Sequence, residues 1–485
     1  MSVSRHTAYN LVGAAVPIAL ALITVPIYLR LVGPDRYGVL AIAWLLLGYF
    51  GLFDLGLGRA TSFRIAALRD ASPQARADTF WAALTINLAM GLVGGAVLWL
   101  AGSLFFGHMF KVDEALRPEI LASMPLLACA VPVATLTGVL TGAMQGRERF
   151  LETNTISVIS TTLFQLLPLL WAWRFGPDLI GLLGAAILAR AISLAVLMQR
   201  CHAVLARGQI RRLVKTEVPA LLRYGGWVTT SSIFGPLLVI VDRFVIGGVL
   251  GAHAVTAYSV PFQLAQRIQV LPSALTTALF PKMSAAEGDE RKAMAYDATH
   301  TLAALITPPV LVAIFLLEPL LSLWVGREMA TLSTPLGRIL ILGFWANAFA
   351  LVPFMKLQSS GRPDLVTKVL LIEIPPYLAT LWAGMKLFGL PGSAMAFAAR
   401  CIVDFVLLTW AAGRDFRPLP SLFSHLLMVV AAIALAGHYS PGAWQWWIGL
   451  ALLPAFAASL GWRTLPQGQR NLIVSRTRAA FRAKA

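Results

Sequence analysis

Charged and amide side chains interrupt several long apolar stretches, and their chemistry suits the binding of an anion. In the stretch 254–280, Gln263 and Gln266 precede Arg267 within a polar stripe at steps of three and four that also includes Ser259, Ser273 and Thr277. A guanidinium offers planar bidentate hydrogen bonds that match phosphate or pyrophosphate. Because an ionisable residue is costly inside a membrane, we interpret Arg267 as lining a cavity, with hydrogen bonding between helices as the alternative.

Three further arginines are candidates for the same chemistry. Arg59, Arg190 and Arg400 each lie within an apolar stretch or near its end. Arg59 could instead extend its side chain to the lipid headgroups. Arg400 is one helical turn from Asp404, so these two charges could simply neutralise each other. Arg190 has no acidic residue at such a spacing on its own helix, which makes it a stronger candidate for the cavity than Arg400.

Glu373 and Asp404 are the acidic residues that could bind a coupling proton or cation. Glu373 precedes Pro375-Pro376, a pair that frees backbone carbonyl groups nearby. An ion pair between Glu373 and Lys368 is the alternative. Arginines outnumber glutamates inside the apolar stretches, which argues against a cationic substrate, because such a substrate would need carboxylates in its site.

The sequence contains no pattern typical of a catalytic centre. It has no Walker A loop, no G-x-S-x-G elbow, no H-E-x-x-H and no C-x-x-C. The seven histidines are scattered, and the three cysteines are too far apart in sequence to indicate a disulfide framework or a metal site. We therefore predict a protein that is not an enzyme and that has no metal and no cofactor.

The elements that position these residues are predicted to be membrane helices. Of 485 residues, 58% are hydrophobic and only 13% are charged, and the mean hydropathy is +0.75. Soluble chains carry about 25% charged residues, so a soluble enzyme and a disordered chain are both excluded. The net charge of +17 could indicate a nucleic-acid partner, but the basic residues lie mostly between apolar runs. We predict no such partner.

The apolar runs are long enough for about fourteen spanning helices of about 20 residues each. We expect these spans at 10–32, 38–62, 79–105, 119–143, 154–174, 179–199, 218–243, 254–280, 298–321, 335–355, 367–388, 392–413, 422–438 and 445–461. Lys and Arg are about three times as frequent in the connections on one side as on the other, which predicts that both termini are cytoplasmic. The basic tail 463–485 would then also be cytoplasmic.

Short motifs recur at a nearly constant offset and predict an internal repeat. Leu31-Val32-Gly33-Pro34 resembles Val249-Leu250-Gly251-Ala252, and Ala189-Arg190 resembles Ala399-Arg400. Two halves of six helices each enter the membrane from the same side, and such a parallel repeat is one signature of alternating-access transporters. We therefore expect an all-α polytopic fold with two six-helix lobes around a central cavity. The lobes would span 1–205 and 206–415, and two additional helices would span 416–462.

Several longer motifs resemble those of the polysaccharide transport family, whose Wzx-like flippases belong to the multidrug/oligosaccharidyl-lipid/polysaccharide exporter superfamily. These motifs are Leu31–Gly38, Gly51–Ala60, Gln145–Phe150, Asp242–Gly251 and Leu275–Lys282. The resemblance covers nearly the whole chain. It implies that an undecaprenyl-pyrophosphate-linked oligosaccharide is flipped to the periplasmic leaflet of a bacterial inner membrane, for surface polysaccharides such as lipopolysaccharide. It also implies arginines in the cavity, here Arg267 and Arg59.

The expected partners are the lipid-linked oligosaccharide and membrane lipids, together with a polysaccharide polymerase and glycosyltransferases. Two other functions compete with this one. A multidrug or cation antiporter of the same superfamily would have a cavity dominated by carboxylates. A membrane enzyme, such as a polymerase or an acyltransferase, would need a large outer loop, and the longest predicted outer connection, near 106–118, is short.

Overall fold

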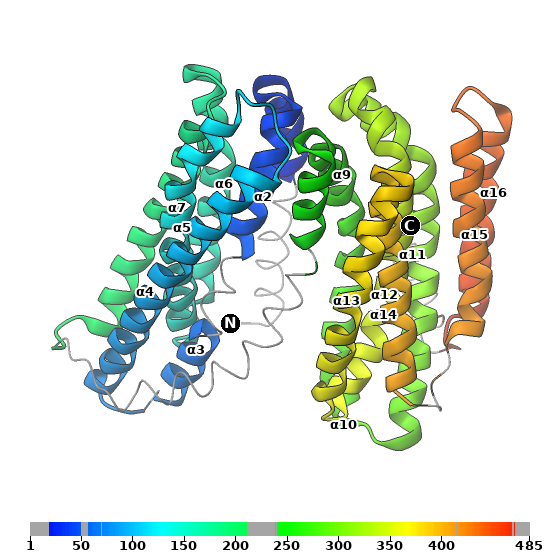
Figure 1. The fold of residues 1–485 in the computed structure, drawn as a ribbon. Coiled ribbons are helices and arrows are strands. Elements are labelled where there is room, and N and C mark those ends of the chain that lie inside the picture. The colour runs from blue at the N-terminus through cyan, green and yellow to red at the C-terminus, as the bar shows by residue number, and fades with distance from the viewer. Residues whose placement is uncertain are drawn as a thin grey trace, which may run out of the picture. The chain divides into compact units, whose positions relative to one another are not determined.

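The computed structural model describes residues 19–49, 57–68, 70–210, 238, 240–413, 416, 418–467 and 470. It divides the chain into two compact units, which we call unit 1 (Met1–Thr256) and unit 2 (Ala257–Ala485). Within the described ranges every regular element is a helix (Figure 1). The predicted all-α fold is therefore confirmed, whereas the span predicted at 218–243 falls mostly outside the described residues.

The first described helix of unit 1 is apolar and covers Ala19–Val32. The helices that follow are α2 (Pro34–Tyr49), α3 (Leu57–Ala67), α4 (Pro73–Leu104), α5 (Arg117–Gly146), α6 (Phe150–Phe175) and α7 (Leu179–Cys201). Short π-helical turns, η2 (Phe105–Met109) and η3 (His202–Ala206), extend α4 and α7. After a helix over residues 240–250, α9 (Ala252–Ala265) begins in unit 1, where its Thr256 hydroxyl donates to the carbonyl of Pro34.

Small residues allow the helices of unit 1 to pack closely. A Cβ atom added to Gly142 of α5 would lie 2.0 Å from the carbonyl oxygen of Gly58 in α3. A Cβ atom on Gly95 of α4 would lie 2.6 Å from the carbonyl oxygen of Ala128 in α5. Lipid chains are as apolar as leucine, so helices in a membrane associate through such close packing rather than through the hydrophobic effect.

Unit 2 is built around one long, largely buried helix, α12 (Arg327–Ser359), which contacts most of the other described helices of the unit. Its other elements are the end of α9, η4 (Gln266–Gln269), α10 (Val270–Ala285), α11 (Gly288–Val325), α13 (Pro363–Phe388), α14 (Leu390–Ala411), α15 (Leu419–His438) and α16 (Trp444–Thr464). The last two helices pack on α11 and on each other.

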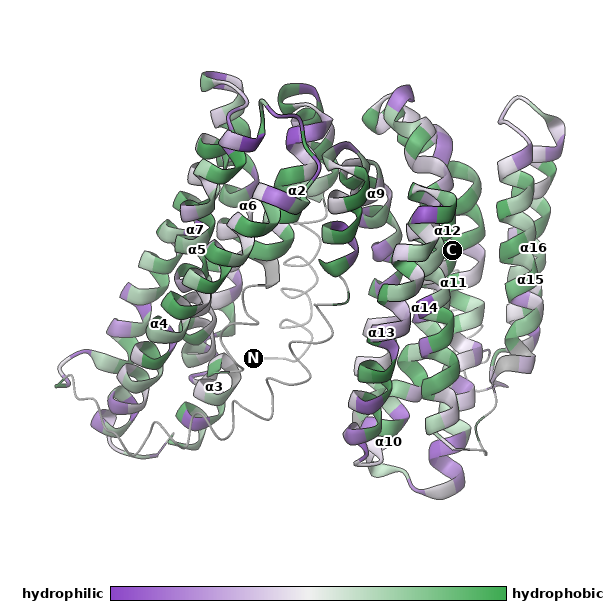
Figure 2. Cartoon of the chain, in the orientation of Figure 1, coloured by the Kyte–Doolittle hydropathy of each residue, from purple (hydrophilic) through white to green (hydrophobic). Residues whose placement is uncertain are grey.

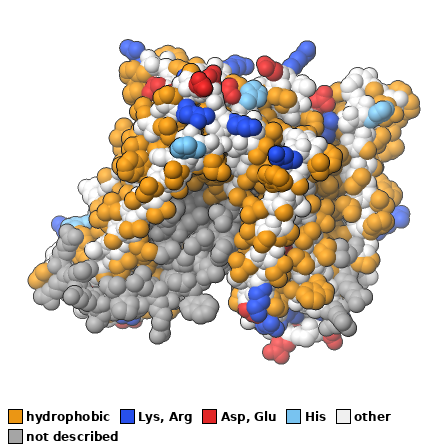
Figure 3. Space-filling view, viewed as in Figure 1, with side chains coloured by type: hydrophobic (Ala, Val, Ile, Leu, Met, Phe, Trp, Pro, Cys, Tyr) orange, Lys and Arg blue, Asp and Glu red, His pale blue; other side chains and the backbone are white. Residues whose placement is uncertain are grey.

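The described helices have the length and composition of membrane spans. Eight of them are long and apolar enough to cross a membrane, and two shorter apolar helices lie at Ala19–Val32 and Leu422–His438. Apolar residues dominate the middle of most helices, and hydrophilic residues concentrate near the helix ends (Figure 2). In the space-filling view, Lys, Arg, Asp and Glu likewise gather mainly near the helix ends (Figure 3). The chain is a multi-pass membrane protein.

Helix lengths and turns bear out the internal repeat. Helices α6 and α13 are both 26 residues long, and both their first and their last residues are 213 positions apart. Gly33 and Gly251 occupy matching turns with φ of +80° and +94°, a conformation in which only glycine avoids a steric cost. The predicted domain boundaries at 205/206, 415/416 and 462/463 remain predictions. The two compact units instead divide within α9, between Thr256 and Ala257.

Candidate functional site

Arg267 lies on a short 3₁₀ segment between two α-helices of unit 2. This segment, η4, follows α9 and is held against α12 by Gln269, whose side-chain amide donates to the carbonyl of Phe344 at 2.8 Å. Gln266 and Arg267 are exposed, and Gln263 is half-buried. Arg267 forms no ion pair or side-chain hydrogen bond with any other described residue. No described residue therefore occupies its guanidinium, which is available to a ligand.

The polar stripe predicted on one face of a single helix over 254–280 is interrupted. Pro272 lacks the N–H that would bond the carbonyl of Ile268, and its ring crowds that carbonyl, so the chain tightens into η4 just before it. Four residues in a 3₁₀ helix turn about 80° further than in an α-helix. Along the stripe Ser259 is buried, whereas Ser273 and Thr277 are exposed.

Arg190 of α7 rests on an aromatic ring in unit 1. Its guanidinium carbon lies 4.7 Å from the centre of the Phe164 ring of α6. The Nε atom is buried without a hydrogen-bond partner, and Arg190 forms no ion pair within the described residues. Phe164 also contacts Trp44, whose indole nitrogen is likewise buried and has no acceptor in the described part of the chain. Unit 1 thus holds two buried donors close to one ring and no described carboxylate that compensates Arg190.

Arg400 of α14 has a similar aromatic setting in unit 2 but a different charge environment. Its guanidinium lies 5.4 Å from the Tyr377 ring and 5.5 Å from the Phe397 ring. Asp404 and Glu373 both interact electrostatically with it, although neither is within ion-pair distance. The sequence left open whether Arg400 pairs with Asp404 or lines the cavity, and the structure places Glu373 as well as Asp404 near Arg400.

Glu373 and Asp404 form a carboxylate pair between α13 and α14. Glu373 is buried, and neither of its carboxylate oxygens has a hydrogen-bond partner of standard geometry among the described residues. Asp404 accepts a long hydrogen bond, 3.5 Å, from the amide of Asn347 in α12. Lys368 pairs with Asp364 at 3.6 Å, so the alternative of a Glu373–Lys368 pair is not realised. The structure thus brings together three of the predicted residues: Glu373, Arg400 and Asp404.

The other predicted residues are not joined to this cluster in the described structure. No hydrogen bond, ion pair or ring contact among the described residues connects Arg267 with Arg400. Arg190 belongs to unit 1, whereas Arg267 and Arg400 belong to unit 2. The backbone of Arg59 lies in α3, but its side chain is outside the described residues.

Two ion pairs that include a buried arginine were not predicted from the sequence. Arg338 of α12 pairs with Glu318 of α11 at 3.1 Å. Asp242 and its neighbour Arg243, in the helix over 240–250, pair at 2.7 Å and are both almost completely buried. The first pair joins residues 20 positions apart on different helices, so helical spacing could not reveal it. The second could have been recognised as adjacent opposite charges inside an apolar run.

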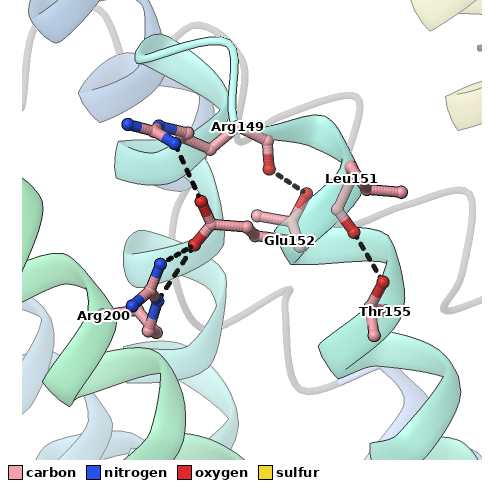
Figure 4. Close-up of polar contacts among 6 residues, drawn as sticks. Arg149, Leu151, Glu152, Thr155 and Arg200 are labelled. Atoms are coloured by element: carbon pink, nitrogen blue, oxygen red, sulfur yellow. Dashed lines mark hydrogen bonds and ion pairs between the residues drawn. The ribbon is translucent and has the colours of Figure 1, made fainter.

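A third ion-pair group connects α6 and α7 at their predicted cytoplasmic ends. The Glu152 carboxylate accepts from Arg149 at 3.1 Å and from Arg200 at 2.8 Å (Figure 4). Arg149 and Arg200 are both exposed and count among the basic residues that predict the cytoplasmic side. Exposed pairs of this kind contribute little to stability, typically about 0.2–1 kcal/mol. We therefore assign this group to helix pairing rather than to a binding site.

The sequence matches known proteins over most of its length. The family model described as "Polysaccharide biosynthesis protein" matches residues 3–287, and the MatE model matches residues 228–378. A Shigella flexneri protein provisionally named an O-antigen transporter is 29% identical over 411 residues, which are 84% of this chain and 97% of that protein. The succinoglycan biosynthesis transport protein ExoT of Rhizobium meliloti is 23% identical, over 90% of this chain and 85% of that protein.

Solved structures show the same fold at low sequence identity. The lipid II flippase MurJ, in an inward closed conformation, matches with a TM-score of 0.74 and 13% identity, over 95% of this chain and 99% of that chain. An inward-facing multidrug resistance MATE transporter matches with a TM-score of 0.61 and 15% identity, over 91% of this chain and 97% of that chain. The chain shares the fold of these MurJ and MATE structures, and it belongs to the polysaccharide biosynthesis protein family.

Proposed function

We propose that this protein is a flippase for a lipid-linked oligosaccharide used in surface polysaccharide biosynthesis. It moves an undecaprenyl-pyrophosphate-linked oligosaccharide from the cytoplasmic to the periplasmic leaflet by alternating access. The Shigella relative is named an O-antigen transporter and the Rhizobium relative a succinoglycan transport protein, and both names agree with this class of cargo. The protein acts by transport rather than catalysis.

The observation that carries this proposal is the environment of Arg267. It is an exposed arginine at the junction of two helices, with no carboxylate paired to it among the described residues. An uncompensated guanidinium inside a membrane span is costly unless a cavity or a ligand receives it. Pyrophosphate supplies what Arg267 lacks, because its oxygens accept bidentate hydrogen bonds. Gln263 and Gln266 lie within one turn of Arg267 and would add amide donors.

Arg190 extends the same chemistry to unit 1. The Phe164 ring holds its guanidinium in place, and no described acid neutralises it. Arg190 is therefore a second candidate for contact with the substrate's pyrophosphate, and Arg59, whose side chain lies outside the described residues, stays a prediction. Arg400 is a weaker member of this set, because Glu373 and Asp404 oppose its charge.

The carboxylate pair of unit 2 is our candidate for ion coupling. Glu373 and Asp404 share a buried site with a single arginine, so one proton or one monovalent cation would balance the local charge. The same pair favours the second candidate function, a multidrug or cation antiporter. The absence of carboxylates beside Arg267 and Arg190 within the described residues argues against a cationic cargo at those positions.

The proposed function also sets the protein's surroundings. It would lie in a bacterial inner membrane with both termini in the cytoplasm, as the distribution of Lys and Arg predicts. Glycosyltransferases would build its substrate on the cytoplasmic side, and a polysaccharide polymerase would use the flipped product.

Flipping by Arg267 variants tests the proposal. The purified full-length chain is reconstituted into liposomes, and movement of a pyrophosphate-linked oligosaccharide between leaflets is measured. We expect Arg267→Ala to reduce flipping by about 10- to 100-fold, the loss of one charge-assisted contact. Arg267→Lys should also transport poorly, because it keeps the charge but loses the bidentate geometry. Arg174→Ala, which removes an exposed arginine at the end of α6, is the matched control.

Thermal unfolding of the same proteins separates the alternatives. If Arg267 served only in structural packing, Arg267→Ala would lower the melting temperature, whereas we expect it to unfold like the control. A well-folded Arg267→Ala protein with full flipping activity would remove this residue from the site. Transport of organic cations in exchange for protons, without flipping of the glycolipid, would instead support the antiporter.

A further inference from the structure

A second polar site lies in unit 2, around the Arg338–Glu318 ion pair described above. It is a pocket of about 330 Å³ between the end of α11 and the first turns of α12, near the lower end of the volumes typical of ligand sites. Its polar lining consists of Glu318 and Ser322 from α11 and Arg327, Thr331, Thr334 and Arg338 from α12. The α12 residues follow at steps of four, three and four, so they share one face of that helix.

The charges in this pocket do not cancel. Arg338 donates from Nη2 to Glu318 Oε2 at 3.1 Å. The Arg338 side chain is only 8% exposed, whereas that of Glu318 is 42% exposed. Arg327 is exposed and forms no ion pair with any described residue. Two guanidinium groups therefore face one carboxylate, which leaves one excess positive charge in a pocket at the start of a helix, where the helix dipole is also positive.

The hydroxyl groups show which hydrogen bonds remain available. Thr331 donates to the carbonyl of Arg327 at 2.9 Å, and Thr334 donates to that of Ala330 at 2.7 Å. Their protons are thus used within α12. The Ser322 hydroxyl has no hydrogen bond to a described residue. Arg338 also donates from Nε to the carbonyl of Ile314 at 3.5 Å. The free donors are therefore Arg327, Ser322 and the remaining N–H groups of Arg338, and a ligand that only accepts hydrogen bonds would match them.

We propose that this pocket binds the phosphate group of an anionic membrane phospholipid. Phosphate oxygens accept from planar guanidinium groups in bidentate geometry, and one negative charge balances the excess positive charge. The pocket lies at the ends of two spanning helices, the level at which lipid headgroups occur. A divalent metal ion would need several oxygen ligands from side chains, and this pocket offers a single carboxylate.

Lipid titration by native mass spectrometry tests this site without a transport assay. The detergent-purified full-length chain is titrated with dioleoyl phosphatidylglycerol, with dioleoylglycerol, which lacks the phosphate, and with inorganic phosphate. We expect retention of phosphatidylglycerol and little retention of dioleoylglycerol. Arg327→Gln should weaken phosphatidylglycerol binding about tenfold, because it removes one charge-assisted contact from an exposed position. Arg174→Gln, beside the largely apolar pocket of unit 1, is the control and should bind like the wild type.

A second variant changes the affinity in the opposite direction. Glu318→Gln releases Arg338 from its carboxylate and raises the charge of the pocket by one, so phosphatidylglycerol should bind severalfold more tightly. A misfolded protein would not gain affinity, and this makes the result specific to the site. Unchanged binding in both Arg327→Gln and Glu318→Gln would overturn the proposal. Equal affinity for inorganic phosphate and phosphatidylglycerol would overturn the assignment to a lipid.

Discussion

Arg190 in unit 1 and Arg400 in unit 2 occupy corresponding places in the two halves of the chain. Each lies on the second helix of a pair and rests on an aromatic ring of the first, Phe164 for Arg190 and Tyr377 for Arg400. Phe164 and Tyr377 are 213 positions apart, the same offset that separates α6 from α13. The stacked arginine is therefore a feature of the repeated architecture rather than of one half.

The two sites differ in the acidic residues around them. In unit 2, Glu373 and Asp404 oppose the charge of Arg400. At the corresponding offsets of 213 and 210, unit 1 has Ser160 and Leu194. The same stacked guanidinium is thus neutralised in one half and uncompensated in the other. We infer that the repeated architecture determines where the arginine lies. The acidic residues around it determine whether the arginine stabilises its unit or attracts an anion.

The largest effect is expected from Arg400→Gln. This change leaves Glu373 and Asp404 buried together without a cation, and removal of one partner from a buried charge group typically costs about 3–5 kcal/mol. Unfolding in detergent, followed by melting temperature and by the amount of protein in the membrane, measures the loss. Arg190→Gln is the matched change in unit 1 and should cost much less.

Asp404→Asn in the Arg400→Gln background provides the control for that interpretation. Removing one of the two carboxylates should restore much of the lost stability. If Arg400→Gln and Arg190→Gln were equally well folded, the proposed difference in charge compensation between the units would be wrong.

An intermediate effect, on transport rather than on stability, is expected from Arg190→Gln. If Arg190 contacts the pyrophosphate, its loss removes about 1.5–3 kcal/mol of interaction, which corresponds to roughly 10- to 100-fold slower flipping. Arg190→Lys should restore part of the activity, since it keeps the charge on the Phe164 ring. Flipping in liposomes, normalised to folded protein, measures this. Wild-type rates in Arg190→Gln would assign Arg190 to packing alone.

The smallest effect on stability is expected from Glu373→Gln. This change removes one of two like charges and keeps the size of the side chain, so the free energy of unfolding should change by less than about 1 kcal/mol. If Glu373 binds the coupling ion, flipping in the variant should no longer respond to an imposed proton or sodium gradient. The response to each gradient is compared with that of the wild type and of Ser160→Ala, the corresponding position in unit 1. A wild-type response in Glu373→Gln would exclude Glu373 from coupling.

Hydropathy and repeated motifs predicted much of the fold. The predicted span 154–174 lies within α6, and 367–388 lies within α13, because about twenty consecutive apolar residues have few alternatives to a membrane helix. The repeat was recognisable in the sequence at Gly33 and Gly251, because both turns have a positive φ and a positive φ favours glycine. The resemblance to polysaccharide transporters agrees with the family match over residues 3–287.

The environments of the charged residues could not be predicted from the sequence and are visible only in the folded chain. The sequence singled out Arg267, Arg190, Arg400, Glu373 and Asp404 because each is costly in an apolar run, and cost is a property of one residue in its own segment. Whether a charge is compensated depends on side chains from other helices, such as Glu373 of α13 beside Arg400 of α14, or Glu318 of α11 beside Arg338 of α12. Local composition therefore determined that these residues lie in membrane helices, and only packing between helices separated the neutralised arginines from those free to bind an anion.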